Sequence, residues 1–217
     1  MKDVAIFHRN LRIEDNAALY NASLNQEYFS LFVFDKKYWS QADRSVNQLQ
    51  FALDSLTELE AKLKKFNVNL YVFEGDLEEL ANYLNKSYPN LNLHMNHTTE
   101  TEYFSKNLKK LSKVNSLNLV NHKDFGIQIS GQNRDIWARD WQVYMKTKTF
   151  DVPLVNKNLN SLDLPTFSKF KADLDQSSVH TQKGGTNSGK ELLTSFLEKR
   201  CKGCLLYTSD AADELSC

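Results

Sequence analysis

Val4-Ala-Ile-Phe-His-Arg-Asn-Leu-Arg-Ile-Glu-Asp-Asn-Ala-Ala-Leu19 is the stretch that decides the fold of this chain. Its first four residues are apolar, and the run is short enough for a buried strand. The sequence turns polar at His8 and stays mostly polar to Asn16, and Asp15 can cap a helix that begins at Asn16. A buried strand, a polar loop and a capped helix form the first unit of an α/β sheet. Because open α/β sheets bind ligands at the carboxyl ends of their strands, the loop is a candidate ligand site.

Strand and helix patterns alternate along the chain up to residue 146. Strands separated by helices form parallel sheets with helices on both faces, and right-handed crossovers favour the order 3-2-1-4-5. We therefore predict an α/β fold with a Rossmann-like, five-stranded parallel sheet and the first strand at its centre. No G-x-G-x-x-G follows any strand, so the usual pyrophosphate cradle is not expected. The strands are predicted at 3–7, 28–34, 69–74, 91–95 and 117–121, and the helices at 16–25, 44–66, after a cap at Asp76, at 101–112 and at 135–146.

The chain changes character after the last of these helices. From 148 to 184 periodicity fails and Pro, Asn, Asp and Ser are frequent, which predicts an interdomain linker. One more amphipathic helix is predicted at 191–200. The residues from Gly184 to Lys190 fit the phosphate-loop pattern G-x-x-x-x-G-K, but Glu191 stands where Ser or Thr would bind magnesium. No apolar strand precedes them either, so we expect no phosphate site there.

All three cysteines, Cys201, Cys204 and Cys217, lie in the last 17 residues. Cys201 and Cys204 have C-x-x-C spacing, but one pair cannot complete a four-ligand zinc site, and nothing indicates a disulfide framework. Residues 204–217 contain no Asn or Lys, in contrast to the body of the chain, and resemble translated sequencing-adapter read-through. We therefore expect a non-native tail that does not pack on the domain.

Twenty-seven basic and 27 acidic residues cancel, so no overall field draws the chain to DNA or to a membrane surface. No apolar run reaches the length of a membrane span and the N-terminus lacks signal-peptide character, so we predict a cytoplasmic protein. His94 and His97 lie three residues apart near Glu100 and Glu102. Without a third defined ligand they indicate a solvated loop, and we predict no metal site.

The chain contains 21 lysines but only six arginines. A chain that uses lysine freely can keep arginine for places where a planar, bidentate donor is needed. Arg9 and Arg12 lie beside the carboxyl end of the first strand, as a ligand site would require. Structural ion pairs use arginine as well, so both explanations stay open at this point.

Trp137 and Trp141 are one helical turn apart and share a helix face. Such a pair could transfer electrons or contact a chromophore. Aromatic side chains dominate protein cores, however, so we expect these two to pack their helix onto the sheet.

Several segments carry a resemblance to the photolyase/cryptochrome family, and together they span residues 3 to about 203. One of them begins at Arg44 and loosely echoes the family pattern R-x-x-F-L-x-x-S-L-x-x-L at Gln48, Phe51, Ser55, Leu56 and Leu59. Phe7 to Leu19 resembles the family's opening signature, W-x-R-x-D-L-R-x-x-D-N-x-A-L, although Asn10 stands where the family usually has Asp. The matching positions there are Arg9, Leu11, Arg12, Asp15, Asn16, Ala18 and Leu19. The stretch 126–145 is similar to a bacterial branch of the family at Arg134, Asp135, Trp137, Ala138, Trp141 and Met145. The stretch 184–200 resembles the block that opens the flavin domain at Gly184, Gly185, Leu193, Phe196, Leu197 and Arg200.

This resemblance implies a division of the chain. Residues 1–147 would be the family's α/β domain, 148–184 the interdomain linker, 185–203 the first helix of a truncated FAD-binding domain, and 204–217 the non-native tail. The full-length protein would be a blue-light-dependent deoxyribodipyrimidine photolyase that holds FAD noncovalently in a C-terminal helical domain and repairs pyrimidine dimers in damaged DNA. The fragment alone is expected to be a monomer without catalytic residues, repair activity, membrane attachment or strong nucleic-acid binding.

The α/β domain of the family commonly holds an antenna chromophore. The resemblance implies such a site at the carboxyl edge of the sheet, beside His8, Arg9, Asn10 and Arg12. The family's folate-contacting Asn-Glu pair is not recognisable near Glu102, so the identity of the chromophore stays open. Two alternatives also stay open: a cryptochrome-type photoreceptor, and a stand-alone nucleotide-binding or partner-binding α/β module.

Overall fold

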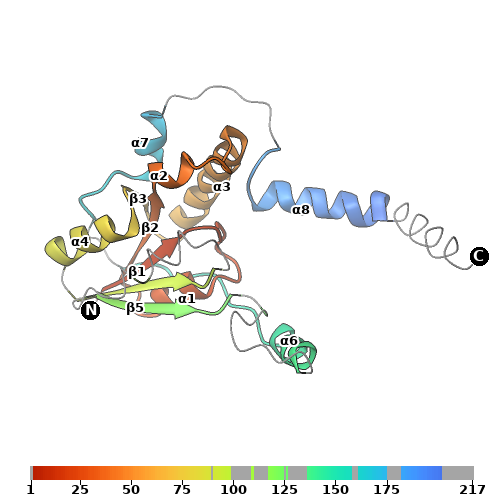
Figure 1. Ribbon diagram of the computed structural model, residues 1–217. Coiled ribbons are helices and arrows are strands. Elements are labelled where there is room, and N and C mark those ends of the chain that lie inside the picture. The colour runs from red at the N-terminus through yellow and green to blue at the C-terminus, as the bar shows by residue number, and fades with distance from the viewer. Residues whose placement is uncertain are drawn as a thin grey trace, which may run out of the picture.

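The computed structural model describes residues 2–88, 90–98, 109, 117–124, 126, 136–157, 161–174 and 182–201. Its centre is a five-stranded sheet in which all pairs of neighbouring strands are parallel (Figure 1). The strand order is β3-β2-β1-β4-β5, so the prediction of a parallel sheet with the first strand at its centre is confirmed. The strands are β1 (Lys2–Phe7), β2 (Tyr28–Phe34), β3 (Leu70–Glu74), β4 (Leu91–Asn96) and β5 (Leu117–His122).

Helices cover both faces of the sheet, as predicted. The face that carries Ala5 and Phe32 packs against α1, α3 and α7, and the face that carries Ile6 and Leu31 packs against α4. The strands β1, β2 and β3 are mostly apolar because both of their faces are covered, whereas β4 and β5 alternate apolar and polar residues. The helices are α1 (Ala17–Ser23), α2 (Lys36–Trp39), α3 (Val46–Lys64), α4 (Leu77–Ser87), α6 (Trp137–Met145), α7 (Phe167–Ala172) and α8 (Thr186–Ser195), which continues as a π-helical turn, η1 (Phe196–Arg200). The helix predicted at 101–112 lies outside the described residues apart from residue 109.

The cap of α1 is one residue later than predicted. Asn16 is the N-cap, and its side-chain oxygen accepts a hydrogen bond from the Leu19 amide at 3.1 Å. Asp15 instead has a φ of 49°, and its carboxylate accepts a hydrogen bond from the Phe150 amide at 3.1 Å. The Asp15 amide donates to the Phe150 carbonyl, also at 3.1 Å. Asp15 therefore ties the first loop to the segment after α6. The predicted cap at Asp76 is confirmed.

The stretch predicted as an interdomain linker also contributes to the core of the domain. Its described part contains α7, which was not predicted, and buries Phe167 and Phe170 in the core on the α3 side. The Val72 amide donates to the Pro165 carbonyl at 2.9 Å, and Tyr71 forms an antiparallel bridge with Thr166. These contacts cover the free edge of β3, which would otherwise expose unpaired backbone groups.

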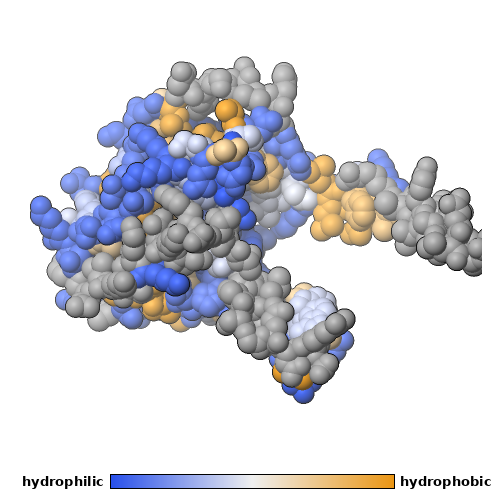
Figure 2. Space-filling view, in the orientation of Figure 1, coloured by the Kyte–Doolittle hydropathy of each residue, from blue (hydrophilic) through white to orange (hydrophobic). Residues whose placement is uncertain are grey.

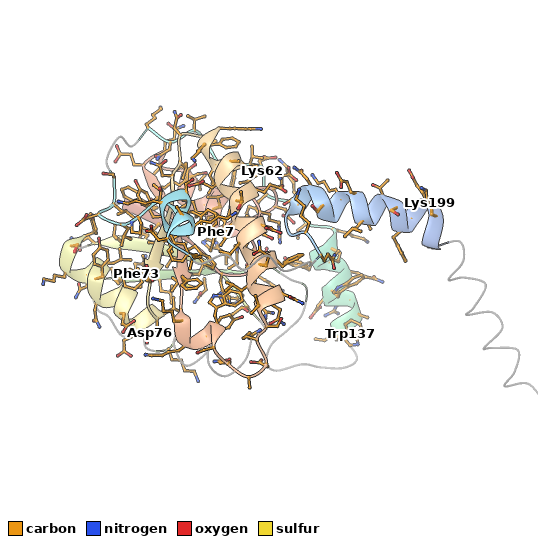
Figure 3. The ribbon with its side chains drawn as sticks, turned by 90° about the horizontal axis from the view of Figure 1, so that it is seen from above. Phe7, Lys62, Phe73, Asp76, Trp137 and Lys199 are labelled. Atoms are coloured by element: carbon orange, nitrogen blue, oxygen red, sulfur yellow. The ribbon has the colours of Figure 1, made fainter. Side chains whose placement is uncertain are left out.

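The interpretation of Trp137 and Trp141 as core residues is wrong. No residue of α6 is buried, and the two indoles are 53% and 43% exposed. Figures 1 and 3 place α6 and α8 on the side of the domain away from α4. Arg139 pairs with Asp140 at 3.4 Å, and Arg134 lies outside the described residues.

The last helix begins at Thr186, five residues before the predicted start at 191. The residues from Thr186 to Lys190, which complete the phosphate-loop pattern, are therefore helical. Figure 2 shows apolar side chains on this projecting segment, where Leu193 and Leu197 are each 57% exposed. Within the described part of the chain, no helix combines the length and apolar character needed to cross a membrane.

Candidate functional site

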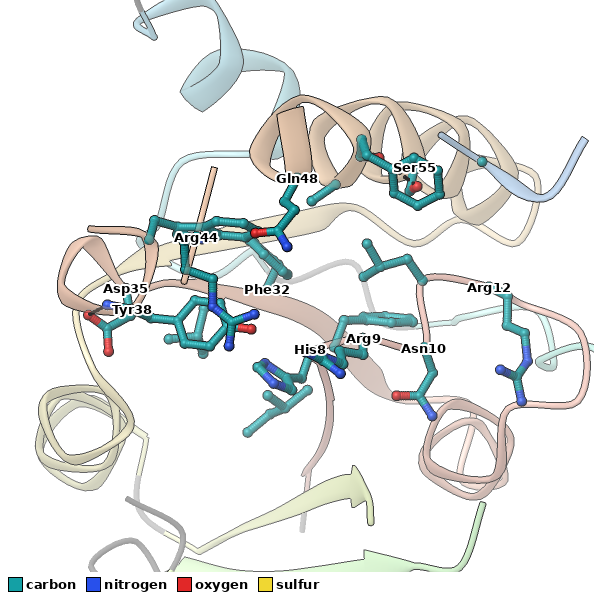
Figure 4. Close-up of a pocket in the computed structure, with 18 of the residues that line it drawn as sticks. His8, Arg9, Asn10, Arg12, Phe32, Asp35, Tyr38, Arg44, Gln48 and Ser55 are labelled. Carbon is teal, nitrogen blue, oxygen red and sulfur yellow. Dashed lines mark hydrogen bonds between the residues drawn. The ribbon is translucent and has the colours of Figure 1, made fainter. Parts of the chain in front are cut away.

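A cavity of about 870 Å³ opens at the carboxyl ends of β1 and β2, against α3 (Figure 4). All four residues predicted for the antenna site, His8, Arg9, Asn10 and Arg12, line it. These four residues therefore lie together at this edge of the sheet. Its use as a ligand site stays a proposal.

Sequence reasoning missed the part of the wall contributed by α2 and by the start of α3. The Asp35 carboxylate accepts hydrogen bonds from the amides of Lys37 and Tyr38 at 2.8 and 3.3 Å, which caps α2 and fixes Tyr38 in the cavity wall. The Arg44 guanidinium carbon lies 4.2 Å from the centre of the Tyr38 ring, a cation–π distance. The His8 ring meets the same tyrosine edge-on at 5.8 Å. Together these side chains build an aromatic and cationic wall.

Helix α3 supplies polar and apolar groups to the opposite side of the cavity. Gln48, Phe51 and Ser55 share one face of this helix, and all three line the cavity. The sequence signals for them were the amphipathic pattern of 44–66 and a loose resemblance to the family pattern that begins at Arg44, and neither says which residues face a ligand. Figure 4 shows this helix, with Gln48 and Ser55, across the cavity from the loop that carries Arg9, Asn10 and Arg12.

Asp124, which follows the edge strand β5, holds the polar loop in place. Its carboxylate pairs with the Arg12 guanidinium at 3.1 Å and accepts a hydrogen bond from the Asn10 side chain. Burial raises the pKa of Asp124, and the guanidinium of Arg12 opposes that rise. An aspartate at position 10, as in the family signature, would bring a second carboxylate against Asp124. Asparagine suits this position because it can donate to the carboxylate.

The charge of the cavity wall favours an anionic ligand. Arg9, Arg12 and Arg44 line it, and the described lining residues include no lysine. Asp35 is the one carboxylate among them, and it already caps α2. Half of the six arginines therefore meet in one place in a chain with 21 lysines. Arginine binds phosphate and carboxylate groups through a planar fork and stacks on aromatic rings, so the wall fits a planar ligand with an anionic group.

A second polar cluster, which we call the Asp3 cluster, lies under α1 on β1, β4 and β5. The buried Asp3 carboxylate accepts hydrogen bonds from Asn25 at 2.7 Å, from Asn92 at 2.8 Å and from His94 Nε2 at 3.0 Å. Because the carboxylate accepts, His94 donates from Nε2, which leaves Nδ1 to accept from His122 Nε2 at 2.9 Å. The prediction of a solvated loop is thus wrong for His94, which is 8% exposed on β4, whereas His97 is exposed.

The Asp3 cluster predicts acid sensitivity. Burial, and to a smaller extent the nearby His94 and His97, lowers the pKa of His122 from 6.5 to about 4. The unfolded chain therefore binds a proton as the pH falls through 6.5, whereas the folded chain binds it only near pH 4. Stability is thus lost between pH 6.5 and 4. Full burial would make this loss about 3 kcal/mol, and partial solvent screening reduces our expectation to about 1–2 kcal/mol.

Urea unfolding at a series of pH values measures this effect. His122→Gln should flatten the stability profile between pH 6.5 and 4, whereas His97→Gln, at an exposed position, should leave most of the slope in place. Equal slopes for the wild type and His122→Gln would contradict the assignment.

Comparison with known proteins assigns the family. The sequence model of the DNA photolyase family matches residues 4–119, more than half of the 217 residues. The chain belongs to the DNA photolyase family. It is 36% identical over 85 residues to the (6-4)DNA photolyase of Arabidopsis thaliana, and the aligned stretch covers 34% of this chain and 15% of that protein. It is 31% identical over 189 residues to the deoxyribodipyrimidine photo-lyase of Buchnera aphidicola, and the aligned stretch covers 80% of this chain and 38% of that protein. This photolyase-family chain thus spans well under half the length of both relatives.

Solved structures agree on the fold. The archaeal photolyase of Sulfolobus tokodaii, which holds two FAD molecules that imply a novel light-harvesting cofactor, is 20% identical with a TM-score of 0.67 and matches 89% of this chain and 46% of that one. A cryptochrome of Synechocystis is 16% identical with a TM-score of 0.66 and matches 91% and 46%. Both likenesses support the N-terminal α/β domain fold of the family.

Proposed function

We propose that this chain is the antenna-bearing α/β domain of a blue-light-dependent, FAD-containing deoxyribodipyrimidine photolyase. The observation that carries the proposal is the cavity at the carboxyl edge of the sheet, where Arg9, Arg44 and Tyr38 form one wall in a member of the DNA photolyase family. A chromophore bound there would supply light absorption. The residues of this chain would bind and orient it.

The lining residues fit a planar heteroaromatic chromophore with an anionic group. Tyr38 and His8 offer ring surfaces, and the guanidinium groups of Arg9 and Arg44 would bind phosphate or carboxylate oxygens. The size of the cavity, about 870 Å³, lies in the range of small-molecule and cofactor sites. The Sulfolobus relative, whose two FAD molecules imply a novel light-harvesting cofactor, supports a flavin-type ligand.

Titration of the purified chain with FMN, followed by flavin fluorescence, tests the antenna site. We expect saturable binding, and we expect Tyr38→Ala and Arg44→Ala each to weaken it about tenfold, because each removes one side of the aromatic and cationic wall. Arg139→Ala removes an exposed arginine outside the cavity and serves as the control. If FMN, FAD and a reduced folate all fail to bind, or if Arg139→Ala weakens binding as much as Arg44→Ala, the antenna proposal is wrong.

Repair of pyrimidine dimers is proposed for the full-length protein only. The proposal assigns the catalytic FAD to a helical domain that continues from α8 and η1, and the exposed Leu193 on α8 and Leu197 on η1 support such a neighbour. It keeps the predicted division at residues 147, 184 and 203, with the described part of 148–174 packed on the sheet. Damaged DNA would be the partner of the full-length protein. Illuminating the complete protein with dimer-containing DNA and measuring dimer loss tests this step.

A cryptochrome-type photoreceptor is the second candidate function. The Synechocystis cryptochrome matches this fold as well as the archaeal photolyase does, and Cryptochrome-1 of Aedes aegypti is 26% identical over 100 residues. The same repair measurement separates the two functions: a complete protein that binds FAD but repairs no dimer would be assigned to the photoreceptors.

A further inference from the structure

Helix α8 is attached to the domain through its first residues. The Gly184 backbone lies directly on α3, because a Cβ at this position would approach the Phe51 carbonyl oxygen to 2.0 Å. The Gly184 amide also donates to the Asp54 carboxylate at 3.3 Å. Only glycine allows this close approach, so the chain is fixed against α3 just before the helix begins.

Two further carboxylates hold the first turn of α8. Both oxygens of Glu58 lie within hydrogen-bond distance of the Asn187 amide, at 3.1 and 3.3 Å, and Glu14 pairs with Lys190 at 3.0 Å. Negative charge is favourable at a helix N-terminus, where amides without partners point outward. Burial would raise the pKa of Glu58, but Lys62 and the Asn187 amide outweigh it and lower the pKa; the bond to Lys190 lowers the pKa of Glu14. Both carboxylates are therefore ionised at neutral pH. We call Asp54, Glu58 and Glu14 the carboxylate clasp.

Beyond this clasp, α8 projects away from the sheet domain (Figures 1 and 3). Every residue of α8 is described, and each of them is exposed or half-buried. Burial of side chains therefore adds little to its attachment, and the clasp contacts decide whether the helix stays docked. Segments with few buried apolar contacts open locally at low free energy.

The docked end of α8 is also a wall of the cavity. Gln182, Gly185 and Thr186 line it together with the loop from His8 to Arg12. Glu14, which holds Lys190, belongs to the same loop. Ser55 lines the cavity beneath this end and is 6% exposed, and a Cβ on Gly184 would lie 2.7 Å from its hydroxyl. Detaching α8 would uncover this part of the cavity.

We propose that the carboxylate clasp makes the start of α8 a gate on the cavity. When the clasp contacts are formed, the start of α8 is held against α3 and closes the cavity on the α8 side. When the clasp opens, the helix detaches from α3 and this side of the cavity is exposed to solvent. A force or partner that moves α8 thereby changes access to the cavity. This inference does not depend on which ligand the cavity takes, so it can fail while the antenna proposal stands, and the reverse.

Thiol labelling at position 55 measures the gate without any ligand. The three native cysteines are replaced by serine, and Ser55→Cys introduces one thiol behind the docked end of α8. Glu58→Ala and Glu14→Lys should each raise the labelling rate about five- to tenfold, because each removes a hydrogen bond or ion pair that keeps α8 docked. Adding Lys190→Glu to Glu14→Lys restores an opposite-charge pair and should return the rate toward its original value.

Asp151→Ala removes an exposed carboxylate outside the clasp, paired with Lys148 at 3.4 Å, and is the matched control. Urea unfolding of each variant separates gate opening from a general loss of stability. Labelling rates that rise at unchanged global stability and fall again in the charge-swapped variant support the gate. Unchanged rates in Glu58→Ala and Glu14→Lys overturn it, and so does a rise that the swap leaves in place or that only follows global unfolding.

Discussion

Replacing Asp3 with alanine should lower the free energy of unfolding by about 3–5 kcal/mol, because it removes the acceptor at the centre of a buried polar cluster. Asp3 is 2% exposed, and its carboxylate accepts hydrogen bonds from Asn25, Asn92 and His94. In Asp3→Ala these three donors stay close to the sheet without their acceptor. His94 also loses the group that orients its ring toward His122, so the link between β4 and β5 weakens as well.

Urea denaturation of the purified chain measures this loss, and Asp151→Ala, at an exposed position, should change stability by less than about 0.5 kcal/mol. Asp3→Asn is the informative second variant. It keeps the shape of the side chain but places an amide donor among donors, so it should also destabilise the chain. A loss below about 1 kcal/mol in Asp3→Ala would mean that water or neighbouring groups satisfy the cluster without its carboxylate.

The sheet could be predicted from the sequence because its signals are local and continuous. The first three strands are apolar runs, the last two alternate apolar and polar residues, and the alternation of strands with helices predicts a parallel sheet. The prediction failed where the structure depends on contacts distant in sequence. Asp15 and Asn16 are both good caps, and only the pairing of Asp15 with Phe150 leaves Asn16 as the cap of α1. Helix α2 has four residues, too few for a periodic pattern.

The candidate site was predicted in part for the same reason. His8, Arg9, Asn10 and Arg12 follow a strand directly, so their place at its carboxyl edge follows from topology. Tyr38 and Arg44 join the wall through α2 and the start of α3, and no spacing in the sequence links them to that loop. The wall needs both groups of residues: the loop that topology places at the sheet edge, and the side chains that packing adds.

The histidines show that a polar residue can be buried where its sequence pattern predicts exposure to solvent. His94 follows the alternation of β4, and a polar side chain on a strand usually faces solvent. It lies inside because Asp3, two residues from the N-terminus, supplies a buried acceptor on the neighbouring strand. That pairing depends on the register between β1 and β4, which a single sequence does not reveal. Polar residues at the start of a central strand therefore have to be considered together with those on its neighbours.

Phe167→Ala should lower the free energy of unfolding by about 3–5 kcal/mol, although the residue lies in a stretch with the composition of a linker. Its ring is 1% exposed and belongs to the core between the sheet, α3 and Phe170. A cavity there would have no nearby chain to fill it, because Val72 and Pro165 fix the segment to the edge of β3 through their backbone hydrogen bond. The segment 161–174 thus contributes to the core of the domain. It does so through a few separate contacts, which leave no periodic pattern in its sequence.

Phe150→Ala is the matched control, since that phenylalanine is 38% exposed and should cost about 1 kcal/mol or less. Urea unfolding compares the two variants, and limited proteolysis shows whether 161–174 detaches before the sheet unfolds. If Phe167→Ala loses no more stability than Phe150→Ala, the segment is a linker that rests on the domain without stabilising it. If it loses the full amount, any shortened version of the α/β domain has to extend through residue 174 to fold, because the edge of β3 and the core under α3 are completed only there.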